Sequence, residues 1–156
     1  MTIKTRFNKK NHKIYNPKNV GKYTGTYPII MRSSWETAFA RWCDMNPNVV
    51  SWSSENTAIP YKHPLKVTTK GLPKTARYYP DFLITIKNGK GLVKWLIEIK
   101  PYKETIQPRG IKKNRKSMIY EQKTWKINRA KWRAAERYSK KMGWLFKIIT
   151  EKELLI

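Results

Sequence analysis

The sequence predicts one α/β domain built around a mixed β-sheet. Two segments carry apolar residues at helical spacing, and several short apolar runs lie between and after them. The expected order is a helix, several strands that include a hairpin, a second helix and a last strand, which is typical of helices packed on a sheet. A length of 156 residues fits a single domain, and 40% apolar residues are enough for a hydrophobic core.

The first helix is predicted to begin at Ser33, because Ser33 and Glu36 have the spacing of a capping box. Asn46-Pro47 ends it, since the residue before a proline avoids the helical conformation. The apolar residues of this segment recur on one helical face, namely Trp35, Ala38, Phe39 and Trp42.

The segment before this helix, residues 1–30, contains seven Lys or Arg and no acid. Proline and glycine interrupt it repeatedly. We therefore expect a basic and mostly irregular N-terminal arm, with the single domain at residues 31–156.

The middle of the chain is predicted to form the sheet. The expected segments are two short strands, a basic loop and a longer strand, at residues 49–52, 57–61, 62–75 and 77–86. Asn88-Gly89 indicates a hairpin. The return strand over residues 92–100 is nearly all apolar, so we expect it at the centre of the sheet and covered on both faces.

The C-terminal third is predicted to contain a flexible basic loop over residues 101–116 and a helix over 117–142. Gly143 stands where a glycine commonly ends a helix. A last strand is expected at residues 144–149, followed by a terminal turn or short helix that begins at residue 150 with capping-box spacing.

The charge balance points to an anionic polymer as partner. The chain has 34 Lys and Arg against ten Asp and Glu, a formal net charge of +24. The positive charges of so basic a protein repel one another, which favours binding to a polyanion. Nucleic acid is the expected partner, with an anionic membrane surface as the alternative. No apolar run is long enough to span a bilayer, and Met1–Lys13 lacks the apolar core of a secretion signal, so we expect no membrane insertion and no secretion. Cys43 is the only cysteine, which fits a reducing compartment and excludes an internal disulfide.

Two of the few acids stand at the ends of apolar strand-like runs, in Pro80-Asp81 and in Glu98-Ile99-Lys100. Cleavage of a phosphodiester needs a hard cation, and Mg²⁺ takes carboxylate oxygens as ligands. Asp81 and Glu98 are therefore candidate metal ligands, with the Ile99 carbonyl as a third. Glu98 and Lys100 fall on the same face of a strand, so Lys100 is a candidate to hold or deprotonate the attacking water.

These acids have a simpler interpretation as cross-strand ion pairs with Lys100 and Lys94. The scarcity of acids, and the cost of an unpartnered charge inside the apolar run that holds Glu98, favour the metal site. Glu36 can supply a further acid to that site, or serve only as part of its helix cap.

The basic loop and the second helix are the predicted DNA-binding surface, because Lys and Arg contacts to phosphates give affinity without sequence information. The candidate DNA-binding residues are Lys103, Arg109, Lys112, Lys113, Arg115, Lys116 and Lys131.

This arrangement resembles the PD-(D/E)XK nuclease superfamily. The resemblance rests on Glu36, Pro80-Asp81 and Glu98-Ile99-Lys100, followed by a basic helix and a strand. The layout is similar to the transposon endonuclease TnsA type. Segments of the first 60 residues are more specifically similar to the head completion nucleases of T-even-like tailed phages, namely residues 22–28, 32–36 and 42–46.

The resemblance implies a restriction-endonuclease-like αβββαβ core and a Mg²⁺-dependent DNA endonuclease, with Mn²⁺ as a plausible substitute. It assigns Asp81 and Glu98 to the metal, Lys100 to catalysis and Glu36 as the accessory acid. Gln122, Asn128 and Lys131 are its candidates for a further polar residue from the second helix. It implies double-stranded DNA as substrate, portal, neck or head proteins as partners, and action in the host cytoplasm or on the virion.

Two alternatives remain open. The chain can be a non-catalytic basic virion protein that binds DNA through charge, in which case the acids are ion pairs. It can also be a transposase or repair-type nuclease with the same chemistry and another partner.

Overall fold

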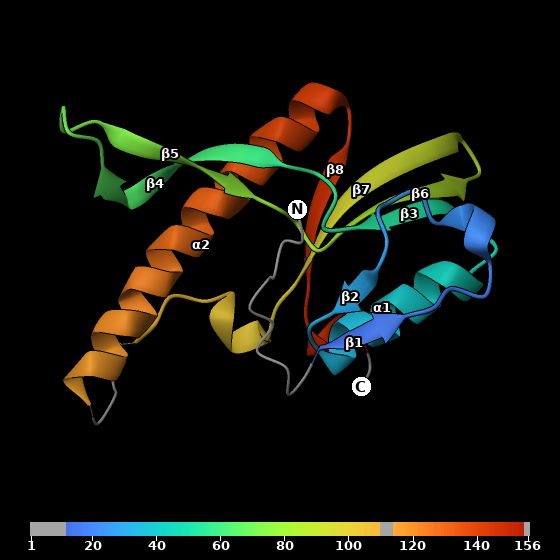
Figure 1. Cartoon of the computed structure of the whole chain (residues 1–156), viewed down its shortest axis with the longest axis horizontal. Coiled ribbons are helices and arrows are strands. Elements are labelled where there is room, and N and C mark those ends of the chain that lie inside the picture. Colours follow the sequence, from blue (N-terminus) through green and yellow to red (C-terminus); the bar gives the residue numbers. More distant parts are fainter. Residues whose placement is uncertain (1–11, 110–113, 155–156) are drawn as a thin grey trace.

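The computed structural model describes residues 12–109 and 114–154 (Figure 1). The helices are α1 (Ser34–Met45), α2 (Arg115–Met142) and the short α3 (Glu151–Leu154), with 3₁₀ turns η1 (Val20–Lys22) and η2 (Tyr102–Glu104). The strands are β1 (Lys13–Tyr15), β2 (Ile29–Met31), β3 (Val49–Ser54), β4 (Ile59–Val67), β5 (Pro73–Tyr78), β6 (Phe82–Asn88), β7 (Gly91–Ile99) and β8 (Leu145–Ile149). Among the described residues, no helix is both long and apolar enough to cross a bilayer.

A four-stranded mixed sheet in the order β3-β6-β7-β8 forms the centre of the molecule. Strand β6 pairs antiparallel with both β3 and β7, while β8 runs parallel to β7 after the crossover through α2. The order α1-β3-β6-β7-α2-β8 is the expected αβββαβ core, so the predicted mixed α/β architecture is confirmed.

The core lies in two layers, one on each face of the sheet. The first cluster packs α1 and the N-terminal strands against the sheet through residues that include Phe39, Trp52 and Ile97. The second cluster packs α2 and the β4–β5 hairpin on the other face and includes Leu96 and Trp132. The adjacent residues Leu96 and Ile97 belong to opposite clusters, so the C-terminal half of β7 is covered on both faces as predicted, whereas Leu92 and Lys94 nearer its start are exposed.

The helix boundaries follow the predicted caps closely. Ser33 caps α1, and its Oγ accepts from the Glu36 N–H at 3.1 Å. Helix α2 begins two residues before the expected position, with Asn114 as its N-cap, and ends at Gly143 in the left-handed conformation with φ +75°. Thr150 and Glu153 form the last capping box, with their side chains 2.6 Å apart.

Two expectations for the middle of the chain are wrong. The predicted loop over residues 62–75 is mostly strand, because β4 and β5 pair into a long hairpin. The predicted strand over residues 77–86 is two strands, with a break at Tyr79-Pro80-Asp81. Pro80 has no N–H for a sheet hydrogen bond, so the chain leaves the hairpin here and enters the main sheet.

The expected irregular arm is also wrong for its described part, residues 12–30. Strand β1 pairs with β2, and the side chains of Tyr23, Ile29 and Met31 are buried in the first cluster. Residues 1–11 lie outside the described part of the chain. The described part of this segment therefore packs on the first cluster through Tyr15, Tyr23, Ile29 and Met31.

Asp44, which is fully buried near the end of α1, holds this segment in place. Its carboxylate accepts hydrogen bonds from the Lys18 and Asn19 N–H groups at 2.7 and 2.9 Å and from the Tyr15 hydroxyl at 2.9 Å. Burial alone would raise the pKa of Asp44, but these hydrogen bonds stabilise the charged form and keep its pKa below the usual value.

Replacement of Asp44 by asparagine is expected to lower the free energy of unfolding by about 2–4 kcal/mol. An amide presents N–H groups to the backbone donors of Lys18 and Asn19. Because the folded pKa of Asp44 is depressed, its stabilisation is present above the usual aspartate pKa and is lost as pH falls through the folded value. Urea unfolding at pH 7 and at acid pH measures both effects.

The matched control is Glu136→Gln, an exposed acid on α2, which should change the stability by no more than about 0.5 kcal/mol. Equal stability of Asp44→Asn and wild type at pH 7 would contradict the role of this carboxylate.

Candidate active site

Asp81 and Glu98 lie side by side at one end of the sheet. The antiparallel register pairs Phe82 with Ile97, so Asp81, one residue before β6, stands opposite Glu98. The Ile99 N–H donates a hydrogen bond of 2.7 Å to Asp81 Oδ2. The structure thus brings the two predicted acids together where β5 gives way to β6.

Glu98 is buried, with 5% of its surface exposed. The Tyr78 hydroxyl donates to its Oε2 at 2.5 Å, and Lys100 Nζ lies 3.6 Å from its Oε1. The predicted placement of Glu98 and Lys100 on one side of the strand is confirmed, and so is an ion pair between them. Within the described part of the chain no ion pair joins Lys94 to either acid, and its Nζ lies over the Trp144 ring instead, 5.5 Å from the ring centroid.

The two carboxylates disfavour each other's charge. Burial raises the pKa of Asp81 well above its usual value, and repulsion from Glu98 and Glu36 raises it further. Burial also raises the pKa of Glu98, although Lys100, the Tyr78 hydroxyl and Lys131 partly oppose this. Asp81 and Glu98 together form a site that a cation would stabilise.

Glu36 reaches the same region from the start of α1. Its Oε2 accepts from the Arg32 N–H at 2.9 Å, so its carboxylate takes part in the helix cap. Burial raises the pKa of Glu36, and its charge acts on Asp81. Both interpretations of Glu36, cap and neighbour of the acid pair, therefore agree with the structure.

An open cleft of about 480 Å³ is lined by Glu98 of this group. Its lining includes three residues that sequence analysis did not single out, Arg32, Glu55 and Tyr78. Arg32 donates from Nε and Nη2 to the two carboxylate oxygens of Glu55 at 2.8 and 3.0 Å. Glu55 has a positive φ of 46°, uncommon for a residue with a side chain, and its N–H donates to the Asp81 carbonyl at 3.0 Å.

Only one of the three helix candidates for a polar residue lines this cleft. Lys131 lines it with Glu98, and desolvation lowers the Lys131 pKa while Glu98 raises it. Asn128 lines a different cavity, and Gln122 donates to the Pro108 carbonyl at 3.5 Å. Of the three candidates, Lys131 is therefore the one that the structure places at this cleft.

The other predicted DNA-binding residues lie outside the cleft. Lys103, Arg109, Arg115 and Lys116 are exposed, the first two in the loop before α2 and the last two in its first turn. Lys112 and Lys113 lie outside the described residues. Trp125 and Trp132, two aromatic residues of α2 near these charges, pack edge to face in the second cluster.

The donor set fits a hard divalent cation. Within the described ranges no three His, Cys, Asp or Glu side chains gather as a complete metal cage. Mg²⁺, however, commonly binds through one or two carboxylates and fills its remaining positions with waters and substrate oxygens. Two partly desolvated carboxylates that repel each other, one of which lines an open cleft, meet that requirement.

Comparison with known proteins gives two results. Residues 46–151 match the sequence profile of a family described as TnsA-like endonuclease N terminal. The chain is also 38% identical over 146 residues to a protein of Enterobacteria phage T4 named "Head completion nuclease", an alignment that covers 88% of this chain and 89% of that protein.

Replacement of Asp81 by asparagine is expected to stabilise the metal-free protein at pH 7 by about 0.5–2 kcal/mol. The folded pKa of Asp81 is raised, so the native state loses stability as pH rises from the usual aspartate pKa through the folded value. The asparagine oxygen can still accept from the Ile99 N–H. Urea unfolding in EDTA at pH 7 and pH 4 measures the gain, which should shrink at the lower pH. A variant less stable than wild type at pH 7 would contradict net repulsion at this site.

Proposed function

This chain belongs to the TnsA-like endonuclease family, and we propose that it is a divalent-metal-dependent DNA endonuclease that acts in completing phage heads. The observation that carries the proposal is the pair Asp81 and Glu98, partly desolvated and mutually repelling, with Lys100 beside Glu98 and with Glu98 and Lys131 lining an open cleft. A purely structural ion-pair network would not need two carboxylates opposite each other.

In this proposal Asp81, Glu98 and the Ile99 carbonyl would hold Mg²⁺, with Mn²⁺ as a substitute. When bound, the cation neutralises phosphate oxygens and acidifies a water. The Tyr78 hydroxyl fixes the orientation of Glu98 through its hydrogen bond. Glu36 contributes a further negative charge beside Asp81.

The two lysines have different tasks. Lys100, held 3.6 Å from Glu98, orients the attacking water or takes its proton. Lys131, on α2, lines the cleft together with Glu98, and its ammonium group stabilises the negative charge that grows on the phosphate.

The proposed substrate is double-stranded DNA, consistent with a formal net charge of +24. The T4 protein's name supports a role at the phage head, with portal, neck or head proteins as partners in the host cytoplasm or on the virion. One site per chain implies that cutting both strands requires a dimer or a second encounter.

Asp81→Ala and Lys100→Ala are each expected to reduce cutting of supercoiled plasmid at least about 100-fold, because each removes a group that acts on the reacting atoms. Nicking or linearisation by the wild-type protein should require Mg²⁺ and disappear in EDTA. Gel retardation by both variants should match that of wild type, because the site is not the main source of affinity.

The matched controls are Lys94→Ala, on the same strand as Lys100, and Glu136→Ala on the exposed side of α2. Both should cut like wild type. Wild-type protein that retards DNA but never cuts it, with Asp81→Ala behaving identically, would support a non-catalytic basic DNA-binding protein instead.

Lys131→Ala is expected to lower kcat about 10- to 100-fold with a smaller change in KM, since its charge acts mainly on the transition state. Gln122→Ala and Lys126→Ala, on the same helix but outside the cleft, should change kcat by less than about threefold. A loss shared by all three variants would show that α2 contributes only general binding.

A further inference from the structure

The β4–β5 hairpin leaves the body of the protein directly at the candidate active site (Figure 1). Its second strand ends at Tyr78, three residues before Asp81. We propose that this hairpin is a duplex-recognition element that lies in the major groove of DNA while the scissile phosphate occupies the cleft at its base. The inference rests on the proposed function and names the part of the chain that selects double-stranded substrate.

The two faces of the hairpin differ. Ile59, Tyr61 and Tyr78 point into the second cluster and anchor the base of the hairpin on α2. On the other side, Lys62 and Arg77 are exposed, and Lys62 Nζ donates to Thr75 Oγ1 at 2.8 Å across the strands. One face is thus committed to the fold and the other is free to meet a partner.

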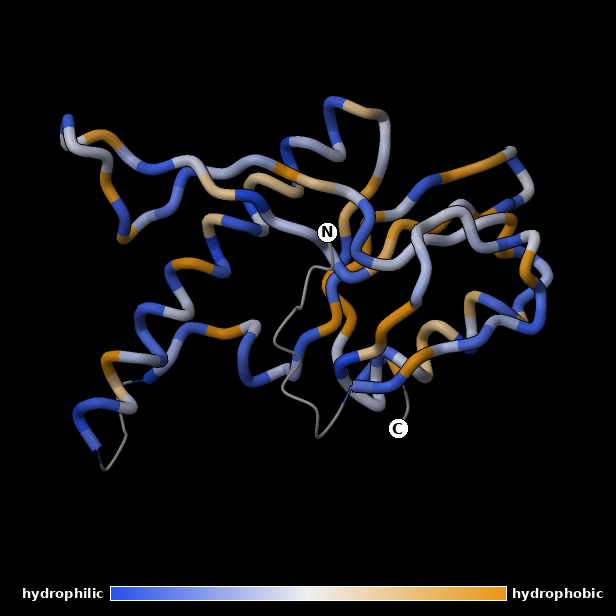
Figure 2. The backbone as a smooth tube through the Cα atoms, in the orientation of Figure 1, coloured by the Kyte–Doolittle hydropathy of each residue, from blue (hydrophilic) through white to orange (hydrophobic). Residues whose placement is uncertain are grey.

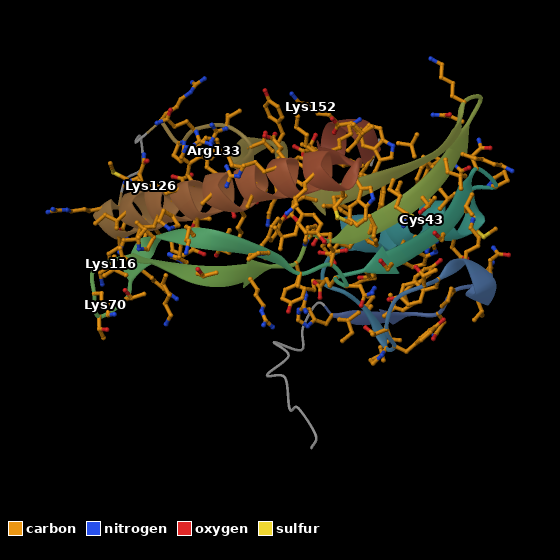
Figure 3. All side chains as sticks on the ribbon, turned by 90° about the horizontal axis from the view of Figure 1, so that it is seen from above. Cys43, Lys70, Lys116, Lys126, Arg133 and Lys152 are labelled. Atoms are coloured by element: carbon orange, nitrogen blue, oxygen red, sulfur yellow. The ribbon has the colours of Figure 1, made fainter. Side chains whose placement is uncertain are left out.

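All the charged side chains of this hairpin are positive. No acid occurs between Glu55 and Asp81, and the hairpin carries five exposed basic side chains, namely Lys62, Lys66, Lys70, Lys74 and Arg77. Arg77 also lines the active-site cleft. The positive charge therefore runs from the cleft along the ribbon to Lys70 near its end, which Figure 3 labels far from Cys43 in α1.

The tip is apolar and structurally defined. Val67 and Leu72 are 67% and 61% exposed, and Figure 2 shows hydrophobic residues near the end of an otherwise largely hydrophilic hairpin. The Thr68 N–H donates to the Leu72 carbonyl at 2.7 Å, and Gly71 takes a positive φ of 77° in the turn. An exposed apolar pair flanked by lysines suits base edges with phosphates on either side.

The dimensions agree with a DNA groove. A major groove about 12 Å wide admits a two-stranded β-ribbon. Strand β5 has six residues, which at about 3.3 Å each extend roughly 20 Å from the cleft. That reach is about half of the roughly 34 Å of one DNA turn, so the tip can contact bases several pairs from the phosphate in the cleft.

The test compares Lys70→Ala/Lys74→Ala with Lys87→Ala/Lys90→Ala. Each pair is exposed and lies in or next to the turn of a hairpin, but the control pair belongs to β6–β7 at the other end of the sheet. Affinity for a blunt duplex and for a single strand is measured over a range of salt. We expect the β4–β5 variant to bind duplex about tenfold or more weakly, with the slope of log K against log salt reduced by about two. The control variant should stay within about threefold of wild type.

A second variant, Val67→Ser/Leu72→Ser, keeps the charge and removes the apolar tip. It should weaken duplex binding severalfold and leave the salt slope unchanged. Wild-type duplex affinity in both β4–β5 variants would overturn the inference, and so would an equal loss in the β6–β7 control or an equal loss on single-stranded DNA. Plasmid cutting by the wild-type protein is scored separately, so a failure of the proposed endonuclease is distinguishable from a failure of the hairpin.

Discussion

The repulsion between Asp81 and Glu98 is the constraint around which the rest of the site is arranged. The sheet register places them opposite each other, and burial removes the water that would otherwise solvate their charges. The groups that surround the two carboxylates stabilise their negative charge. They are the Ile99 N–H, the Tyr78 hydroxyl, Lys100 and Lys131. They come from three separate elements, β5, the end of β7 and α2, so the site exists only once these elements have packed together.

The segment around Pro80 contributes side chains to both hydrophobic clusters. Tyr78 before it belongs to the second cluster, and Phe82 after it belongs to the first. Between them the chain crosses from the hairpin to the main sheet, and Asp81 stands at that crossing. The acid pair is therefore held by both cores, which favours a fixed distance between the carboxylates and α2.

Local signals predicted the parts of the structure that local chemistry determines. The caps at Ser33 and Gly143, and the alternation that puts Glu98 and Lys100 on one side, are properties of a few neighbouring residues. The β4–β5 hairpin was missed because its lysines, prolines and glycine read as a loop, while the buried alternation of Ile59 and Tyr61 is confined to its base. Tyr78 and Asp44 act through partners 20 or more residues away, which no local pattern encodes.

The hairpin is inserted between β3 and β6, two strands that already pair with each other. Its outer part can consequently lengthen, shorten or change sequence without altering the register of the sheet or the positions of Asp81 and Glu98. Only its base, with Ile59, Tyr61 and Tyr78, is tied to the core. With such an arrangement, the outer part of the hairpin can change during evolution while the acid pair stays fixed. Substrate recognition and catalytic chemistry can therefore evolve separately.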